Sequence, residues 1–133
     1  MTFLLDTNIC IYLIRQKPLH VYDKFKSLAL GAVGLSTITV SELTYGVTKS
    51  SNPEKNRDAL EQFLLPFEIL DFDINAEIEY GKVRTYLEKK GTPIGPLDTL
   101  IAAHAKSLNL ILVTNNTREF NRVPKLSIQN WVE

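Results

Sequence analysis

Phe3-Leu4-Leu5-Asp6-Thr7-Asn8 is the stretch of sequence that decides the fold. Three apolar residues followed by an acid and two small polar residues predict a short buried strand that ends abruptly. The apolar run at positions 9–14 then predicts a buried helix directly after it. In open α/β sheets ligands bind at the carboxyl ends of the strands, which is where Asp6 would lie. A simpler interpretation stays open, because Asp, Thr and Asn are also common helix N-caps.

Short apolar segments alternate with helical patterns along the rest of the chain. Strand candidates lie at 32–36, 67–72, 110–113 and 126–128, and helical patterns cover 19–30, 40–47, 53–64, 76–90 and 96–108. Positions 114–120 are expected to form a polar loop. Helices that alternate with short, almost wholly apolar strands are typical of a parallel sheet covered on both faces. We therefore expect one α/β domain over residues 1–133.

Composition sets few limits on function. The chain has 133 residues, with 15 basic and 15 acidic side chains, so its net charge does not indicate a nucleic-acid partner and any such contact must come from local patches. The single cysteine, Cys10, lies in an apolar helical pattern and is expected to be a core residue in a reducing compartment. No apolar run is long enough to span a bilayer. We expect a cytoplasmic, soluble and unprocessed protein without a membrane partner.

Three acids occupy comparable places in the expected fold. Asp6 follows the first strand, Glu42 lies at the start of a helix after the second, and Asp98 lies in the first turn of the helix that leads into the strongest strand. Each has a structural alternative. Glu42 fits a capping box with Thr39, and Asp98, two residues after Pro96, is where an acid favourably meets the helix dipole.

The three acids together nevertheless favour a metal site, because helix starts in a parallel α/β fold gather at one sheet edge. Carboxylates brought together repel one another, and a proton or a hard cation must neutralise them. Oxygen ligands suit Mg²⁺ or Mn²⁺, which can support phosphodiester cleavage. Neither histidine fits this chemistry, because we expect His20 in a surface helix and His104 on the core face of its helix.

Four motifs carry a resemblance to a known family. In chain order they are Leu5-Asp6-Thr7-Asn8, Ser41-Glu42-Leu43, Gly-Thr-Pro-Ile-Gly-Pro-Leu-Asp at 91–98, and Thr-Asn-Asn-Thr-Arg-Glu-Phe at 114–120. With them the chain resembles PIN domains, and specifically the VapC toxins of bacterial toxin-antitoxin pairs, across nearly its whole length. The resemblance implies an α/β/α sandwich with a short, mainly parallel central sheet. It also implies a Mg²⁺-dependent endoribonuclease, the toxin of a type II pair, with Mn²⁺ as a substitute.

The resemblance also implies roles for particular residues. Many PIN domains place a further Asp where Asn116 stands, and an amide binds a metal only as a neutral ligand or orients its water. Glu119 could restore the missing charge, so one or two metal ions remain open. The implied catalytic acids are Asp6, Glu42, Asp98 and Glu119, of which the first three are also metal ligands, and the supporting residues are Asn8, Thr114 and Asn116.

Partners follow from the same resemblance. The third and fourth motifs, at 91–98 and 114–120, are similar to those of the VapC branch that cuts initiator tRNA in its anticodon stem-loop, so tRNA is the first expected substrate. A VapB-like antitoxin, a homodimer, and contact with DNA only through the antitoxin are also implied. The apolar part of the surface that binds the antitoxin is expected from whichever of Tyr12, Leu13, Phe25 and Tyr45 are exposed. Candidate phosphate contacts are Arg118 and Arg122, with Lys82, Arg84, Lys89 and Lys90 as a second set, unless all are solvated surface charges.

Three other classes of protein can be compared with these motifs. A haloacid-dehalogenase-type phosphatase needs a second acid where Asn8 stands. A phosphoreceiver module could use Asp71 or Asp73 as acceptor, but Asn115 and Asn116 stand where its lysine is expected. An inactive PIN-like binding module, whose acids only cap helices, remains open, and divalent-metal binding distinguishes it from an enzyme.

Overall fold

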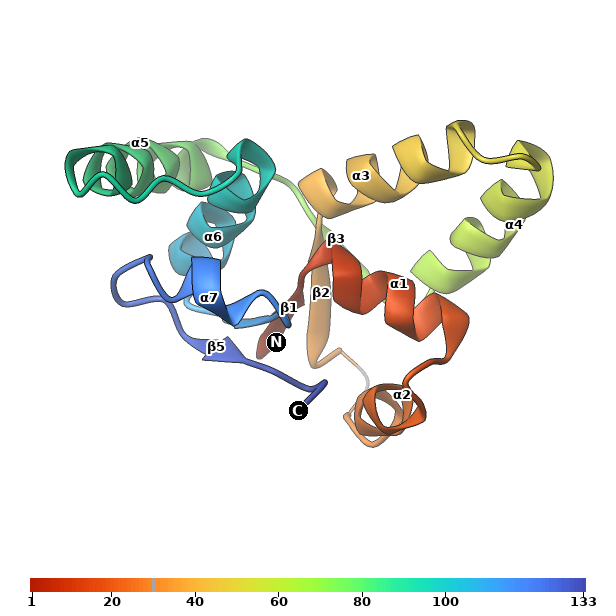
Figure 1. The fold of residues 1–133 in the computed structure, drawn as a ribbon. Helices are drawn as coiled ribbons and strands as arrows, with labels where there is room; N and C mark the ends of the chain where they lie inside the picture. The colour runs from red at the N-terminus through yellow and green to blue at the C-terminus, as the bar shows by residue number, and fades with distance from the viewer. Residues whose placement is uncertain (30) are drawn as a thin grey trace.

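A five-stranded parallel sheet forms the centre of the molecule. The structure is a computed structural model that describes residues 1–29 and 31–133. The strands are β1 (Phe3–Leu5), β2 (Val33–Ser36), β3 (Glu68–Leu70), β4 (Ile111–Val113) and β5 (Ile128–Gln129), in the spatial order β3-β2-β1-β4-β5 (Figure 1). In the central strand, Leu4 pairs with both Gly34 and Leu112. The expected parallel sheet is confirmed, and each expected strand is present within two residues at either end.

Helices accompany the sheet on both faces. In the described part of the chain they are α1 (Thr7–Arg15), α2 (Leu19–Lys26), α3 (Thr37–Thr48), α4 (Pro53–Leu64), α5 (Ile74–Lys89), α6 (Pro96–Leu108) and α7 (Thr117–Phe120). None of these helices is long and apolar enough to cross a membrane.

Three sequence expectations about the helices were wrong. α2 ends at Lys26, where Ser27 bonds back onto the last turn through its N–H and its hydroxyl, and position 30, the expected end, lies outside the described residues. α3 starts at Thr37 rather than near position 40, because Ser36 caps it by accepting from the N–H of Ile38 at 3.0 Å. The loop after β4 contains the one-turn helix α7, which the burial of Phe120 holds against the core.

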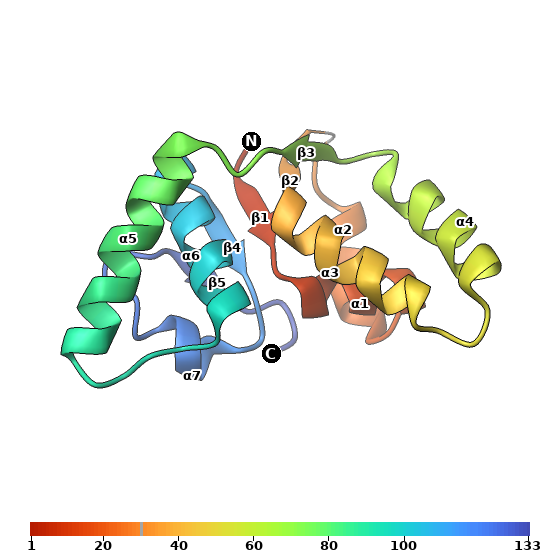
Figure 2. The ribbon, with the colours of Figure 1, turned by 90° about the horizontal axis from the view of Figure 1, so that it is seen from above.

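Two hydrophobic clusters separate the faces of the sheet. Successive side chains of a strand point to opposite faces, and Leu4 and Leu5 accordingly belong to different clusters. The Leu5 cluster includes apolar residues of α1, α2 and α4, and the Leu4 cluster includes those of α5, α6 and α7. Figures 1 and 2 show α5, α6 and α7 on one side of β1 and α1, α2 and α4 on the other. The α/β/α arrangement is thus confirmed.

A buried histidine joins α6 to the start of α3 at the carboxyl end of β2. His104 on α6 is 1% exposed, and its Nδ1 lies 2.8 Å from the hydroxyl of Ser36, the N-cap of α3. Its ring also meets the edge of Phe72, with 5.2 Å between centroids. Burial lowers the pKa of His104. The expectation of a core histidine is confirmed, and its contact fixes where α3 starts relative to α6.

Candidate active site

Asp6 lies at the carboxyl end of β1 and is held on both of its oxygens. Oδ1 accepts from the backbone N–H of Thr7 at 2.7 Å, so Asp6 does cap α1, and Oδ2 accepts from the hydroxyl of Thr114 at 2.8 Å. The residue is 5% exposed, and burial raises the pKa of its carboxyl against the opposing effect of these two bonds. Capping and a place at the sheet edge are therefore compatible roles of one side chain.

Glu42 faces the same edge and does not cap its helix. Because α3 begins at Thr37, Glu42 lies in its second turn, too far along to bond the first backbone groups. Its Oε1 instead accepts from the hydroxyl of Thr7 at 3.0 Å. Burial, reinforced by the charge of Asp6, raises the pKa of Glu42. The capping-box interpretation is wrong, and the start of α1 holds Glu42 beside Asp6.

Asp98 completes the group from the opposite side. It lies in the first turn of α6, and its Oδ2 is 3.5 Å from the amide nitrogen of Asn116, which is also 3.3 Å from Glu119. Burial raises the pKa of Asp98 to about 6, with further contributions from the charges of Asp6, Glu119 and Glu42. Four carboxyl groups from four segments therefore share one electrostatic neighbourhood.

The loop after β4 is ordered by its own polar side chains. The hydroxyl of Thr114 donates to Asp6 and accepts from the N–H of Asn116 at 2.9 Å, so the acid and the loop fix each other. The amide group of Asn115 donates to the hydroxyl of Tyr12 at 2.9 Å, which attaches the loop to α1. Asn116 itself donates between two carboxyl groups, as a neutral residue that partly offsets their repulsion.

Other sequence candidates take different positions. Asn8 is exposed and makes no side-chain hydrogen bond with the described residues. Arg118 is exposed next to Glu119. Arg122 is half-buried and donates to the carbonyl of Pro93 at 3.0 Å, so at least part of its guanidinium group holds a loop. Asp71 and Asp73, the acceptors considered for a phosphoreceiver, are both exposed after β3, and Asp73 caps α5 by accepting from the N–H of Ala76 at 3.1 Å.

The donor chemistry of this group suits Mg²⁺ in an open site. In residues 1–29 and 31–133, no three His, Cys, Asp or Glu side chains form a ready-made metal cage. Mg²⁺ rarely uses such cages, since it binds through one or two carboxylates, keeps several waters and takes phosphate oxygens of the substrate. Burial is the largest cause of the raised pKa values of Asp6, Glu42 and Asp98, and a bound cation would stabilise their ionised forms.

Thr7 is the residue that sequence reasoning missed. Its backbone N–H and its hydroxyl bond two different acids, Asp6 and Glu42. The available signal was its place between Asp6 and Asn8 in the opening motif. Its contact with Glu42 joins residues 35 positions apart, which no local pattern reveals.

Comparison with known proteins gives consistent results. The family model of the PIN domain matches residues 3–126. The chain is 46% identical over 131 residues to the tRNA(fMet)-specific endonuclease VapC of Salmonella typhimurium, covering 98% of both chains. The crystal structure of DNA-bound VapBC from the same organism superposes with a TM-score of 0.93 at 46% identity, covering 98% of each chain. VapBC2 from Rickettsia felis, bound to a promoter DNA fragment, gives a TM-score of 0.92 at 45% identity, covering 98% of this chain and 99% of that chain.

Proposed function

The chain belongs to the PIN-domain family, as a ribonuclease of the VapC type, and we propose that it is the Mg²⁺-dependent toxin of a cytoplasmic type II toxin-antitoxin pair that cleaves tRNA. The observation that carries the proposal is the convergence of Asp6, Glu42, Asp98 and Glu119 at one sheet edge, where burial and the charges of the other three acids raise the pKa of Asp98 to about 6. The relative from Salmonella typhimurium is named as specific for tRNA(fMet), which makes initiator tRNA the first substrate to test.

The residues of the site divide the chemical tasks. Asp6, Glu42 and Asp98 are the expected ligands of Mg²⁺, or of Mn²⁺ in its place, and a bound cation would supply an activated water and stabilise the leaving oxygen. Thr114 and Thr7 hold Asp6 and Glu42 in fixed rotamers through their hydroxyls. Such outer contacts orient the carboxylates before substrate arrives.

An assay of tRNA cleavage tests the activity. Purified protein with Mg²⁺ should cut initiator tRNA in preference to elongator tRNAs, and excess EDTA should abolish the reaction. Asp6→Asn should remove most activity with the fold retained, because the shape is nearly unchanged while a ligand charge is lost. Asp23→Asn, on the exposed surface of α2, is the matched control. Undiminished cleavage in EDTA would refute the metal requirement, and absence of divalent-metal binding would favour an inactive PIN-like binding module.

A hollow beside the acids supports the proposed antitoxin partner. It has a volume of about 280 Å³ and lies between α1, α3 and α4, with Thr7 and Glu42 at its polar end and Ile11, Ile14 and Val47 among its apolar walls. An antitoxin segment with apolar side chains could fill this hollow and place a basic side chain on the acids, where bidentate hydrogen bonds to carboxylates are strong. Two relatives of known structure are VapBC complexes bound to DNA, so we propose that this chain contacts DNA only through its antitoxin. The homodimer implied by the family resemblance is proposed with it.

The proposed antitoxin surface differs from the one expected from the sequence. Leu13 is 3% exposed and belongs to the core, and Tyr12 and Phe25 are partly buried against it, whereas Tyr45 is 65% exposed. Ile14, which is 39% exposed and lines the hollow, is the better probe. Ile14→Glu should weaken co-purification with the antitoxin encoded beside this chain.

The matched control for the antitoxin surface is Ile74→Glu on α5, where the wild-type residue is 65% exposed. Expression of the chain alone should arrest growth, and co-expression of its antitoxin should restore it. Normal growth without the antitoxin, together with an active monomer in vitro, would contradict the toxin assignment. Equal weakening of the complex by both glutamate variants would contradict the place of the interface.

A further inference from the structure

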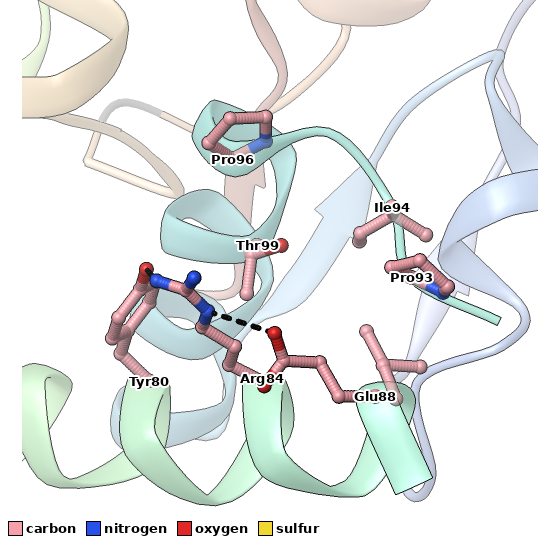
Figure 3. Close-up of a pocket in the computed structure, with 8 residues that line it drawn as sticks. Tyr80, Arg84, Glu88, Pro93, Ile94, Pro96 and Thr99 are labelled. Carbon is pink, nitrogen blue, oxygen red and sulfur yellow. Dashed lines mark hydrogen bonds and ion pairs between the residues drawn. The ribbon is translucent and has the colours of Figure 1, made fainter. Parts of the chain in front are cut away.

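A second hollow lies on the other side of the acids, between α5 and the loop of residues 91–95. One of its walls consists of Tyr80, Arg84 and Glu88, which follow one another at four-residue steps along α5. The guanidinium group of Arg84 donates to the hydroxyl of Tyr80 at 2.8 Å and lies 3.5 Å from the carboxylate of Glu88. Figure 3 shows the side chain of Arg84 along this wall, between Tyr80 and Glu88.

The opposite wall is rigid and apolar. It consists of Pro93, Ile94 and Pro96 from the loop and the start of α6, and Figure 3 shows them across the open space from Arg84. The carbonyl of Pro93 accepts from Arg122, which braces the loop from outside. The hydroxyl of Thr99 donates to the carbonyl of Gly95 at 2.9 Å, which fixes the loop to α6.

The same loop connects this hollow to the acids. Gly95 lies between two residues that line the hollow, and a side-chain carbon placed on it would lie 3.7 Å from Oδ2 of Asp98. Pro96 and Thr99 flank Asp98 on the first turn of α6. A strand of RNA whose scissile phosphate lies at the acids therefore has this hollow within reach of an adjoining nucleotide.

We propose that this hollow, between Tyr80, Arg84, Pro93 and Pro96, is a subsite that holds one unpaired RNA base next to the scissile phosphate. Single-stranded RNA is recognised largely by stacking of bases on aromatic rings and on arginine guanidinium planes. The two hydrogen bonds of Arg84 fix the plane of its guanidinium group before binding, and the proline rings form the opposite face of a slot. The volume, about 160 Å³, is below the roughly 300–1,000 Å³ of typical small-molecule sites, and suits a single ring system.

This inference rests on the proposed ribonuclease function and adds a specificity-determining subsite to it. Arg84 and Glu88 form an exposed ion pair with no net charge, so a simple phosphate site is not the better interpretation. A base, by contrast, offers a face for stacking and an edge whose donors and acceptors meet Glu88 and the unused N–H groups of Arg84. The subsite would select RNA in which the nucleotide beside the cut is free to leave its stack.

The test combines protein variants with RNAs that lack one base. A short RNA containing the cleavage site is prepared as a series in which each nucleotide near the cut is replaced in turn by an abasic one. KM and kcat are measured for wild type, for the double variant Tyr80→Ala/Arg84→Ala, and for Arg84→Lys. The matched control is Tyr86→Ala, a tyrosine of the same helix that is 39% exposed and lies outside the hollow.

One abasic position close to the cut should raise the KM of wild type about 5- to 150-fold, the range expected for loss of one stacked base. The double variant should raise KM for intact RNA by a similar factor, with kcat within about threefold, and should be insensitive to that abasic position. Arg84→Lys should resemble the double variant, because lysine keeps the charge but has no plane for stacking. The Tyr86→Ala control should behave as wild type.

Several results would overturn the subsite. The first is that the effects of the double variant and of each abasic position multiply independently. The second is wild-type behaviour of Arg84→Lys, and the third is an equal effect of the Tyr86→Ala control. The fourth is an unchanged KM together with weaker binding of the antitoxin, which would make the hollow a protein contact. In each of these cases wild type still cleaves RNA, so the proposed function stands. Failure of wild type to cleave any RNA with Mg²⁺ would instead remove the proposed function and the subsite together.

Discussion

Replacing Asp98 by Asn is expected to stabilise the metal-free protein while it abolishes RNA cleavage. The carboxyl group of Asp98 is half-buried among other acids, and its pKa is raised from 3.8 to about 6. A carboxyl group with a raised pKa destabilises the fold when it is ionised. The stability that the folded protein gains from the protonated Asp98 is fully present below the unfolded pKa of 3.8, and it is lost as pH rises through about 6. The asparagine variant carries no charge to desolvate at any pH.

The magnitude follows from the shift and the exposure of the group. A shift from 3.8 to about 6 corresponds to about 3 kcal/mol at about 1.4 kcal/mol per unit, and solvent screening of a half-buried group reduces this to about 1.5 kcal/mol. For a chain of 133 residues, that gain corresponds to a rise in Tm of about 5 °C.

The assay is thermal unfolding in EDTA at pH 7.5 and at pH 4, with cleavage of tRNA in Mg²⁺ measured in parallel. The gain in Tm of Asp98→Asn over wild type should be large at pH 7.5 and mostly absent at pH 4. Excess Mg²⁺ should stabilise wild type more than the variant, because ligand binding stabilises only the state that binds it. The matched control is Glu54→Gln, an exposed first-turn acid that also follows a proline at the helix start and lies away from the acids.

Two results would refute this reasoning. One is a variant less stable than wild type in EDTA at pH 7.5, which would mean that Asp98 stabilises the start of α6 more than its neighbours destabilise it. The other is a gain that is the same at both values of pH, since a gain from removing charge must follow the titration of the carboxyl group. A similar gain in Glu54→Gln would show that the effect is general to first-turn acids.

Three further variants probe the surroundings of the acids. Gly95→Ala should fold normally, because φ of Gly95 is −55° and the added carbon would make an ordinary contact of 3.7 Å with Asp98. Cleavage should nevertheless fall about 10-fold or more, because that carbon shields the carboxylate, and an unchanged rate would contradict this. Asn116→Asp should lower the Tm in EDTA and raise the affinity for Mg²⁺, measured by titrating Mg²⁺ during thermal unfolding, and weaker Mg²⁺ binding would argue that the amide is itself the better ligand. Arg122→Ala removes the hydrogen bond to the carbonyl of Pro93 and should raise KM for RNA about fivefold without changing kcat; a loss confined to kcat would count against a role in bracing the loop.

Local sequence patterns were sufficient to predict the fold and two of the acids. The strands are short and almost wholly apolar, which distinguishes a doubly covered parallel sheet from an exposed one, and Leu4 and Leu5 confirm it by entering different cores. Asp6 could be placed because it directly follows an apolar strand, and Asp98 because it lies two residues after a proline at a helix start. Such positions lie at the same edge of the sheet whatever the details of packing.

The errors and omissions arise where long-range contacts decide. The capping box of Thr39 and Glu42 satisfied a local rule, but Ser36 starts α3 three residues earlier and its hydroxyl is held in place by His104, 68 positions away. Thr7 and the loop contact of Arg122 were likewise invisible, since their partners lie 35 and 29 positions away. A sequence pattern reports which residues can reach an edge, and only tertiary packing reports which hydrogen bonds they form there.

The acids of the site pose one electrostatic problem that a proton, a cation or a basic side chain can each solve. In the described residues the neutral partners of the carboxyl groups are two threonine hydroxyls, the backbone N–H of Thr7 and the amide of Asn116, and no Lys or Arg forms an ion pair with them. A proton neutralises Asp98 below its raised pKa of about 6, and this neutralisation is lost as pH rises above that value. At neutral pH, binding of a Mg²⁺ ion and binding of a basic side chain from a partner exclude one another, because both would neutralise the same carboxylates. On the proposed function, inhibition by an antitoxin therefore follows from competition for these carboxylates as well as from covering of the surface.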